Sequence, residues 1–513
     1  MDLSAEPTPA QPSSKRTSAV RLWLEESAGF KWPEVAALSI FAALVAFAIP
    51  FHEPWSDEAQ AWQLARSLSL GDLFHTYIRY EASPGLWHLL LWVLNRLHVT
   101  YAGIHWVCGA AAVAAAGLLI FESPLPRYLR LTLPFTYFLL FQYAVIARSY
   151  ALVPLLLFLV AILWRKRPVS LALALGLLAN LSLHAAAVSG GLALAYFAQR
   201  HRGRIDRRWR TGADLVSTIL LASLYAFALW TAWPPPDLRL SAFRYDSRPF
   251  ASSALASLTL GICEPWVLSI FFWIAVAIWL RARRSLVLLL PVVFFTAFSG
   301  LVYAQFWHMG LLAPLVIALV WIAWHDAAGS SNWGENAGRA ALVVMAAIQI
   351  AWSAHALAWD HWHAFSGDRA AAQFLQAPVR NGSRILLTWE DEPNAKGFDG
   401  VGVLPYFDHN IFENLPKPFW WWSEKSPIEQ RFNELLPTRP QIVIVEGRLR
   451  SPNESFDMKT PVFQRLLRAG YRFTNQFCGT VPMRLELGLT SCHLIFQRQD
   501  QAQGMVPGSR PAR

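Results

Sequence analysis

The stretch that decides the fold is an uncharged run at residues 168–199, which reads PVSLALALGLLANLSLHAAAVSGGLALAYFAQ. A helix that crosses a bilayer takes about 20 apolar residues, so this run is too long for one helix and long enough for two short ones. It lies between Arg165-Lys166-Arg167 and the arginine-rich segment Arg200–Arg210. Lys and Arg collect in cytoplasmic loops, so basic residues on both sides require an even number of crossings. The run therefore predicts a helical hairpin, and the Gly190-Gly191 pair is compatible with its turn.

The same reasoning organises the rest of the membrane-spanning part. Residues 131–164 are apolar apart from Arg148 and are also bounded by basic residues, which predicts a second hairpin. Single spans are expected at Pro33–Phe51, Tyr101–Phe121, Gly212–Trp233, Pro265–Leu280, Ser285–Tyr303, Gln305–Trp324 and Arg339–Leu357. Together these runs predict a polytopic α-helical membrane protein with about 11 transmembrane helices.

Composition supports this class of protein. The 513 residues are 55% hydrophobic and 15% charged, against roughly 25% charged in an average soluble domain. This excludes a disordered chain, a collagen-like chain and a coiled coil, and argues against a single soluble globule. The net charge of +10 comes from basic residues that lie between apolar runs. We therefore assign that charge to topology and anionic lipid headgroups, and expect no nucleic-acid partner.

The positive-inside rule also orients the chain. Lys15, Arg16, Arg21 and Lys31 place the N-terminus in the cytoplasm, and an odd number of spans then places the C-terminal part outside. We expect a multi-pass protein of the inner (plasma) membrane. Its expected parts are a cytoplasmic tail (1–32, disordered near its start), a transmembrane module (33–357) with an external loop at 52–100, and an extracytoplasmic domain (358–513).

The C-terminal part alternates between strand and helix patterns, which predicts an α/β soluble domain. Strands are expected at Arg384–Thr388, Gln441–Glu446, Tyr471–Phe477 and Cys492–Arg498, and helices at Gly367–Gln376, Pro427–Leu436 and Thr460–Ala469. Cys478 and Cys492 both fall outside the membrane, where a disulfide can form, but their spacing leaves the question open.

The external loop 52–100 holds two helix patterns and an acidic pair. Residues 57–65 predict a short amphipathic helix, and Leu86–Leu97 predicts an interfacial or re-entrant helix. A second external region, Pro234–Glu264, contains Arg239, Arg244 and Arg248.

The adjacent acids Asp57 and Glu58 admit two interpretations. Carboxylates at a membrane surface can act as general bases. Ser56-Asp57-Glu58 is equally a normal helix start, with Ser56 as the N-cap and the acids near the positive end of the helix dipole. The pair taken alone favours the helix start.

A longer sequence pattern favours the catalytic interpretation of this acidic pair. An apolar span is followed by an external Asp57-Glu58-Ala59, then Trp62, then Glu81-x-x-Pro84-x-Leu86-Trp87. This combination resembles the GT-C membrane glycosyltransferases, and within them the bacterial relatives of protein O-mannosyltransferases and lipid A aminoarabinose transferases (the PMT or Rgt-like group). The match covers Ala48–Leu91, and the span pattern extends it through about residue 357. The resemblance implies a GT-C-like fold, an acidic catalytic motif in the first external loop, and a sugar donor on a polyprenyl phosphate.

The resemblance also assigns roles to residues. It makes Asp57 the catalytic carboxylate and Glu58 its partner. Ala147–Leu152, which includes Arg148 and Tyr150, resembles a second family segment in which many relatives carry an acid. No acid lies between Thr132 and Trp164 here, which weakens a two-carboxylate metal site.

Arg148 is then available to bind the lipid phosphate, because a guanidinium matches phosphate geometry; it could equally be a snorkelling residue at a helix end. Tyr150 is assigned with Arg148 to the donor-phosphate site. His308 at the outer end of a span could pair with the phosphate or be structural. Many relatives carry a basic residue beside this histidine, where this chain has Trp307. Glu81 and His88 are expected to bind the acceptor or to fix the loop.

The sequence therefore predicts a membrane glycosyltransferase that moves a sugar from a polyprenyl-phosphate donor to a hydroxyl of a lipid, glycan or protein, with inversion. The alternatives are a transporter or flippase for a lipid-linked substrate, and a non-catalytic membrane assembly subunit. No cluster has metal-ligand spacing, so the sequence supports no metal and no other cofactor.

Overall fold

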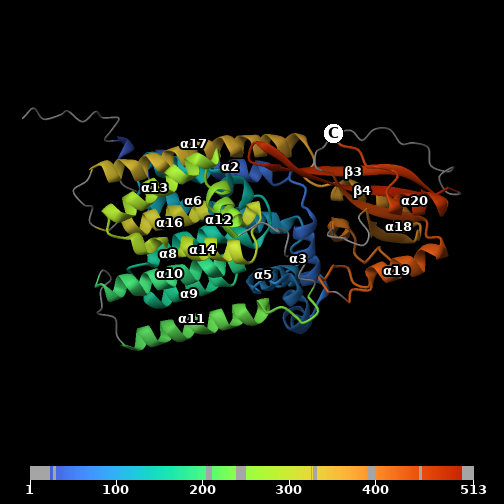
Figure 1. Ribbon diagram of the computed structural model, residues 1–513, viewed down its shortest axis with the longest axis horizontal. Helices are drawn as coiled ribbons and strands as arrows, with labels where there is room; N and C mark the ends of the chain where they lie inside the picture. Colours follow the sequence, from blue (N-terminus) through green and yellow to red (C-terminus); the bar gives the residue numbers. More distant parts are fainter. Residues whose placement is uncertain are drawn as a thin grey trace, which may run out of the picture.

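The helices of the protein lie side by side in one bundle, and the C-terminal domain packs against one end of it (Figure 1). The computed structural model describes residues 23–26, 31–203, 211–238, 250–324, 326, 332–390, 399–423, 425–449 and 453–499. The expected disordered start of the chain, most of the basic segment after Arg200, and Arg239, Arg244 and Arg248 lie outside the described residues.

The apolar runs of the sequence form helices, which makes this a multi-pass helical membrane protein. Among the described residues, four helical stretches are long and apolar enough to cross a membrane: Gly103–Glu122, Gly212–Ala232, Phe306–Trp324 and Trp333–Trp362. The helices of the bundle are α2 (Trp32–Ala48), α6 (Gly103–Glu122), α7 (Arg127–Thr132), α8 (Val153–Leu163), α9 (Pro168–Ala179), α10 (Leu183–His201), α11 (Thr211–Ala232), α12 (Phe250–Leu260), α13 (Trp266–Ala282), α14 (Leu290–Leu301), α15 (Phe306–Met309), α16 (Leu312–Trp324) and α17 (Asn332–Trp362). The helix α12 falls in the region 234–264, where the sequence analysis expected none.

The hairpin predicted at residues 168–199 is present as α9 and α10, but its turn differs from expectation. The turn lies at residues 180–182, and the Ser182 hydroxyl accepts a hydrogen bond from the Ala185 N–H at 3.1 Å, which caps α10. Gly191 lies inside α10, where an added Cβ would be 2.3 Å from the Cα of Pro291. Gly191 therefore allows close helix packing, and the glycine pair does not form the turn.

The first arm of the other hairpin, residues 131–164, is not a continuous helix. After α7 the chain passes through a 3₁₀ turn (Leu133–Phe135) and a π turn (Phe138–Gln142) before α8 begins. Pro134 interrupts the helical hydrogen bonding of the first arm, whereas Pro154 sits in the first turn of α8, where proline is tolerated.

Ion pairs join helix ends and basic segments that the sequence assigns to one side, and the pair of Arg127 with Glu34 is fully buried. Arg127 Nε lies 2.9 Å from Glu34 Oε1, and Arg283 Nε lies 2.8 Å from Glu335 Oε1. Arg165 pairs with Asp326. Each pair connects segments at the ends of different helices, so the two segments of each pair lie at the same end of the bundle, as an even number of crossings between them requires.

Cysteine labelling tests which end faces outward. Ser455 in the C-terminal domain and Lys166 in the loop before α9 are both exposed. We expect a membrane-impermeant maleimide to label Ser455→Cys in intact spheroplasts and to label Lys166→Cys only after permeabilisation. The native cysteines give a low background, because Cys108 and Cys263 are buried and Cys478 is bonded to Cys492. The opposite labelling pattern would invert the assigned topology.

The C-terminal domain is a four-stranded mixed sheet with helices, and its predicted strands and helices are present. The strand order is β1 (Ile385–Trp389), β2 (Ile442–Leu449), β4 (Glu486–Arg498), β3 (Tyr471–Met483). β1 and β2 are parallel, and the other pairs are antiparallel. The helices are α18 (Asp368–Arg380), α19 (Ile428–Leu435) and α20 (Pro461–Arg468). Cys478 and Cys492 face each other across β3 and β4 and form a disulfide.

The loop at residues 52–100 forms the contact surface between the bundle and this domain. It contains α3 (Ser56–Ser67), α4 (Leu70–Asp72), a π turn (Leu73–Tyr77), a 3₁₀ turn (Ile78–Glu81) and α5 (Leu86–Arg96). α3 lies between the bundle and the C-terminal domain (Figure 1). Ser366 Oγ donates to the Pro54 carbonyl at 2.9 Å, and Arg369 Nη2 donates to the His52 carbonyl at 3.1 Å. These hydrogen bonds hold the domain over the start of α3.

Candidate active site

A cavity of about 270 Å³ lies where the bundle meets the C-terminal domain. Its walls come from the start of α3, the loop before α5, the segments around residues 148 and 303, and the strands β2, β3 and β4. Six of the seven site residues predicted from the sequence line it: Asp57, Glu81, His88, Arg148, Tyr150 and His308. The seventh, Glu58, is not among the lining residues.

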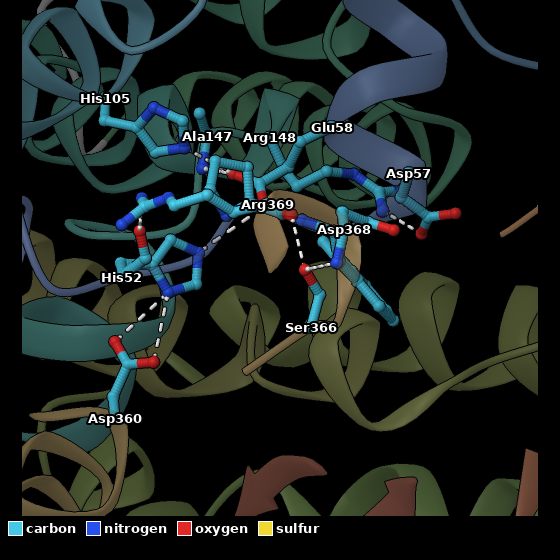
Figure 2. Close-up of polar contacts among 12 residues, drawn as sticks. His52, Asp57, Glu58, His105, Ala147, Arg148, Asp360, Ser366, Asp368 and Arg369 are labelled. Carbon is cyan, nitrogen blue, oxygen red and sulfur yellow. Dashed lines mark hydrogen bonds and ion pairs between the residues drawn. The ribbon is translucent and has the colours of Figure 1, made fainter. Parts of the chain in front are cut away.

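Asp57 and Arg148 form an ion pair in this cavity, and each side chain is about one-fifth exposed. Asp57 lies in the first turn of α3, and Arg148 directly precedes the 3₁₀ turn Ser149–Leu152. The next residue on each side makes a second link, because Glu58 Oε1 accepts the Ala147 N–H at 2.5 Å (Figure 2). Two adjacent contacts therefore fix the register between the two segments.

Glu58 is fully buried on the other side of α3. Its Oε1 lies 2.9 Å from His105 Nε2, its Oε2 lies 3.4 Å from His52 Nε2, and its Oε2 also accepts the Trp55 N–H at 3.0 Å. Burial acts to raise the pKa of Glu58, but the contacts with His105 and His52 outweigh it and hold that pKa well below its usual range.

The helix α3 starts at Ser56, and its N-cap is Trp55. The prediction that Ser56 is the N-cap is therefore wrong by one position.

Glu81 lies close to the Asp57–Arg148 pair and accepts a hydrogen bond from Gln60 Nε2 at 2.9 Å. Burial raises the pKa of Glu81 to about 7, against the opposing effect of the Gln60 hydrogen bond. The carboxyl of Glu81 is therefore partly protonated near neutral pH, unlike an ordinary glutamate.

This shift predicts a pH-dependent stability. With a folded pKa of about 7, raised from an ordinary value of 4.5, the native state binds more protons between these values, so stability falls as pH rises through that window. Glu81→Gln keeps an acceptor for Gln60 and removes the charge. We expect its melting temperature to match the wild type near about pH 5 and to exceed it near about pH 8. An unchanged difference across that range would show that Glu81 is ionised throughout.

Several polar groups in the wall lack partners within the described part of the chain. His88 is buried, and neither of its ring nitrogens has a hydrogen-bond partner there; the same holds for the indole N–H groups of Trp55 and Trp87. Burial and nearby Arg148 lower the pKa of His88 to about 4, so its ring is neutral at physiological pH. These groups can therefore hydrogen-bond a polar ligand in the cavity.

His308 presents a further neutral donor. Its ring stacks on His184 with centroids 4.1 Å apart and contacts Tyr150 edge-on at 5.3 Å. Its Nδ1 accepts the Gln305 N–H at 2.9 Å, so the proton of the neutral ring is on Nε2. The Arg148 guanidinium lies 5.9 Å from the centre of the Tyr150 ring, which joins this aromatic group to the ion pair.

The C-terminal domain completes the cavity with residues that the sequence analysis did not single out. Arg448 adds a second cation, Trp422 adds an aromatic ring, and Val481, Met483 and Leu489 add an apolar wall. The assembled site combines the carboxyl groups of Asp57 and Glu81 with guanidinium groups, neutral hydrogen-bonding groups and aromatic rings. That set suits a ligand with an anionic group, hydroxyls and an apolar portion.

Comparison with known proteins gives few matches. No family model matches the sequence, and no curated protein matches it either. Among solved structures, the chain is similar to the crystal structure of ArnT from Cupriavidus metallidurans bound to undecaprenyl phosphate. The identity is 11%, the match covers 89% of this chain and 97% of that one, and the TM-score is 0.46.

Proposed function

We propose that the protein is a GT-C-type glycosyltransferase that moves a sugar from a polyprenyl-phosphate donor to an acceptor hydroxyl. The observation that carries this proposal is the Asp57–Arg148 ion pair inside a cavity with aromatic and apolar walls at one end of the helix bundle. A carboxylate and a guanidinium in contact supply the base and the phosphate ligand that such a transfer needs.

In this proposal Arg148 acts first, by binding the phosphate, and Asp57 acts second, as the base. The donor phosphate competes with Asp57 for the Arg148 guanidinium, which can donate two parallel hydrogen bonds to phosphate oxygens. Asp57 is then free to accept the proton of the acceptor hydroxyl. The hydroxyl oxygen forms a bond to the anomeric carbon while the bond from that carbon to the phosphate oxygen breaks. The electron pair leaves with the polyprenyl phosphate, and displacement from the opposite face inverts the anomeric centre.

Other lining residues fit the remaining parts of the substrates. The unpartnered nitrogens of His88, Trp55 and Trp87 can hydrogen-bond sugar hydroxyls, and His308 Nε2 can donate to the phosphate. The apolar wall of Val481, Met483 and Leu489 suits the first carbons of a lipid chain that continues into the bilayer. In this proposal the cavity opens at the outer face of the plasma membrane, and the acceptor is a lipid, a glycan or a protein.

An assay with purified protein in proteoliposomes separates this activity from its rivals. The substrate is a polyprenyl phosphate carrying a radiolabelled sugar, offered with membrane lipids and glycans as acceptors. A transferase splits the sugar–phosphate bond and yields free polyprenyl phosphate. A flippase moves the intact lipid between leaflets, and an assembly subunit does neither. Label that stays on the polyprenyl phosphate throughout would contradict the proposal.

A further inference from the structure

We propose that His52, Glu58 and His105 bind a divalent transition-metal ion of the zinc class, behind the cavity and separate from its lining. The three residues come from different elements: His52 follows α2, Glu58 lies in α3, and His105 lies in α6. All three are buried, and their ligating atoms lie within 4.8 Å of one another. Two histidines and one glutamate form a known ligand set for zinc.

The spacing between His52 and Glu58 fits a metal, whereas His105 and Glu58 lie at hydrogen-bond distance. The Nε2 atom of His52 lies 3.4 Å from Glu58 Oε2, and that of His105 lies 2.9 Å from Glu58 Oε1. Nitrogen and oxygen ligands about 2.1 Å from a tetrahedral zinc ion are roughly 3.4 Å apart. A direct charge-assisted hydrogen bond is shorter, at about 2.7–2.9 Å, so the His52–Glu58 contact is long for a hydrogen bond and ordinary for two ligands of one ion.

The surroundings of the ligands have the form of an outer coordination shell. His52 Nδ1 lies 3.1 and 3.4 Å from the two carboxylate oxygens of Asp360 (Figure 2). When the ring of His52 carries its proton on Nδ1, toward Asp360, its Nε2 atom has a lone pair that points at Glu58, which is also an acceptor. A cation between these two acceptors removes their repulsion. Metal-bound histidines usually donate their other ring nitrogen to a carboxylate in this way. The N–H groups of Trp55 and Ala147 orient the Glu58 carboxylate.

The carboxylates around the site also favour a bound cation. Glu58 and Asp360 bring two carboxylates into a site where Glu58 is fully buried and Asp360 is 4% exposed. A divalent ion bound here supplies the positive charge that two buried carboxylates require. A protonated His52, with one N–H directed to Asp360 and the other to Glu58, is the competing arrangement, and His105 then donates a hydrogen bond to Glu58 at 2.9 Å. The metal content of the protein separates the two arrangements.

The ion would hold three elements together at the base of the site. Glu58 is bonded to Ala147, the neighbour of Arg148, and is itself the neighbour of Asp57. A metal that fixes Glu58 therefore fixes the geometry of the Asp57–Arg148 pair without touching a substrate. In this role Glu58, His52 and His105 are positioning residues.

Metal content of the full-length protein tests the proposal without any activity measurement. The protein is purified without chelators, freed of its affinity tag, equilibrated with Zn²⁺ and desalted. We expect about one zinc ion per chain in the wild type, with a water molecule as the fourth ligand, and at least a tenfold loss in Glu58→Gln and His105→Gln. His409→Gln, which changes an exposed histidine in the C-terminal domain, is the matched control and should keep its zinc. A metal-free wild type, or equal zinc in all four proteins, would overturn the proposal.

A spectroscopic measurement on the wild type does not depend on how the variants fold. Chelator-treated protein is titrated with Co²⁺ and its visible absorption is recorded. Strong bands of four-coordinate Co²⁺ support the site, whereas the weak spectrum of hydrated Co²⁺ contradicts it. Because neither measurement uses a sugar donor, a failure here is distinguishable from a failure of the proposed transferase function.

Discussion

Purified Asp57→Asn protein is expected to fold and insert normally and to transfer sugar about 10²–10⁴-fold more slowly than the wild type, the usual contribution of a general base. Asparagine keeps the size of the side chain and is acceptable at a helix start. Its amide oxygen can still accept a hydrogen bond from Arg148. What it cannot do is take a proton from the acceptor hydroxyl, so the loss should appear in turnover and not in folding.

A matched change elsewhere in the same loop serves as the control. Asp72 is exposed and its carboxylate accepts a hydrogen bond from the Ser69 hydroxyl at 2.8 Å, outside the cavity. Asp72→Asn therefore makes the same chemical change without touching the site, and its turnover should stay near that of the wild type. Near-wild-type turnover of Asp57→Asn, measured beside this control, would show that Asp57 is only a helix-start residue.

Arg148→Ala is expected to weaken the binding of polyprenyl phosphate strongly. Truncating one partner of a desolvated charge pair costs about 2–5 kcal/mol, which corresponds to roughly 30- to 5,000-fold in the dissociation constant. The loss has two causes. The phosphate loses its bidentate ligand, and Asp57 loses its counter-charge and repels the incoming anion.

Binding measured in lipid nanodiscs resolves the role of Arg148. We compare polyprenyl phosphate with the uncharged polyprenol, because only the former can use the guanidinium. Arg148→Ala should remove the preference for the phosphate, whereas Arg167→Ala, an exposed arginine in the loop before α9, should keep it. If Arg148→Ala retains the preference while it remains folded, Arg148 is a snorkelling residue and does not bind the lipid phosphate.

Hydropathy and charge were sufficient to predict most of the architecture. The runs Gly212–Trp233 and Gln305–Trp324 became helices because length and apolar character leave few other structures for a segment in a bilayer. The turn of the hairpin at residues 168–199 was mislocated, because the effect of Gly191 depends on its contact with Pro291 in a distant helix. The helix α12 was missed because its serines and the prolines before it resemble a loop.

The candidate site could be predicted where its residues are unusual for their surroundings. Asp57, Arg148 and His308 are polar residues at the ends of apolar runs or within them, and the cavity brings them together. His52, His105 and Asp360 could not be found in this way, because they lie in the segment after α2, in α6 and in α17, and come together only after packing. Arg448 and Trp422 were missed for the same reason, since they reach the cavity only when the C-terminal domain docks.

A profile of lipid-linked sugars in cells that carry the gene tests the central claim most directly. Polyprenyl-phosphate-linked sugars are extracted and quantified by mass spectrometry from wild-type cells, from a deletion strain, and from that strain complemented with the wild-type or the Asp57→Asn gene. The account predicts that one polyprenyl-phosphate sugar accumulates in the deletion strain and with Asp57→Asn, and returns to its normal level with the wild-type gene. The same profile in all four strains would contradict the claim that this protein consumes a lipid-linked sugar.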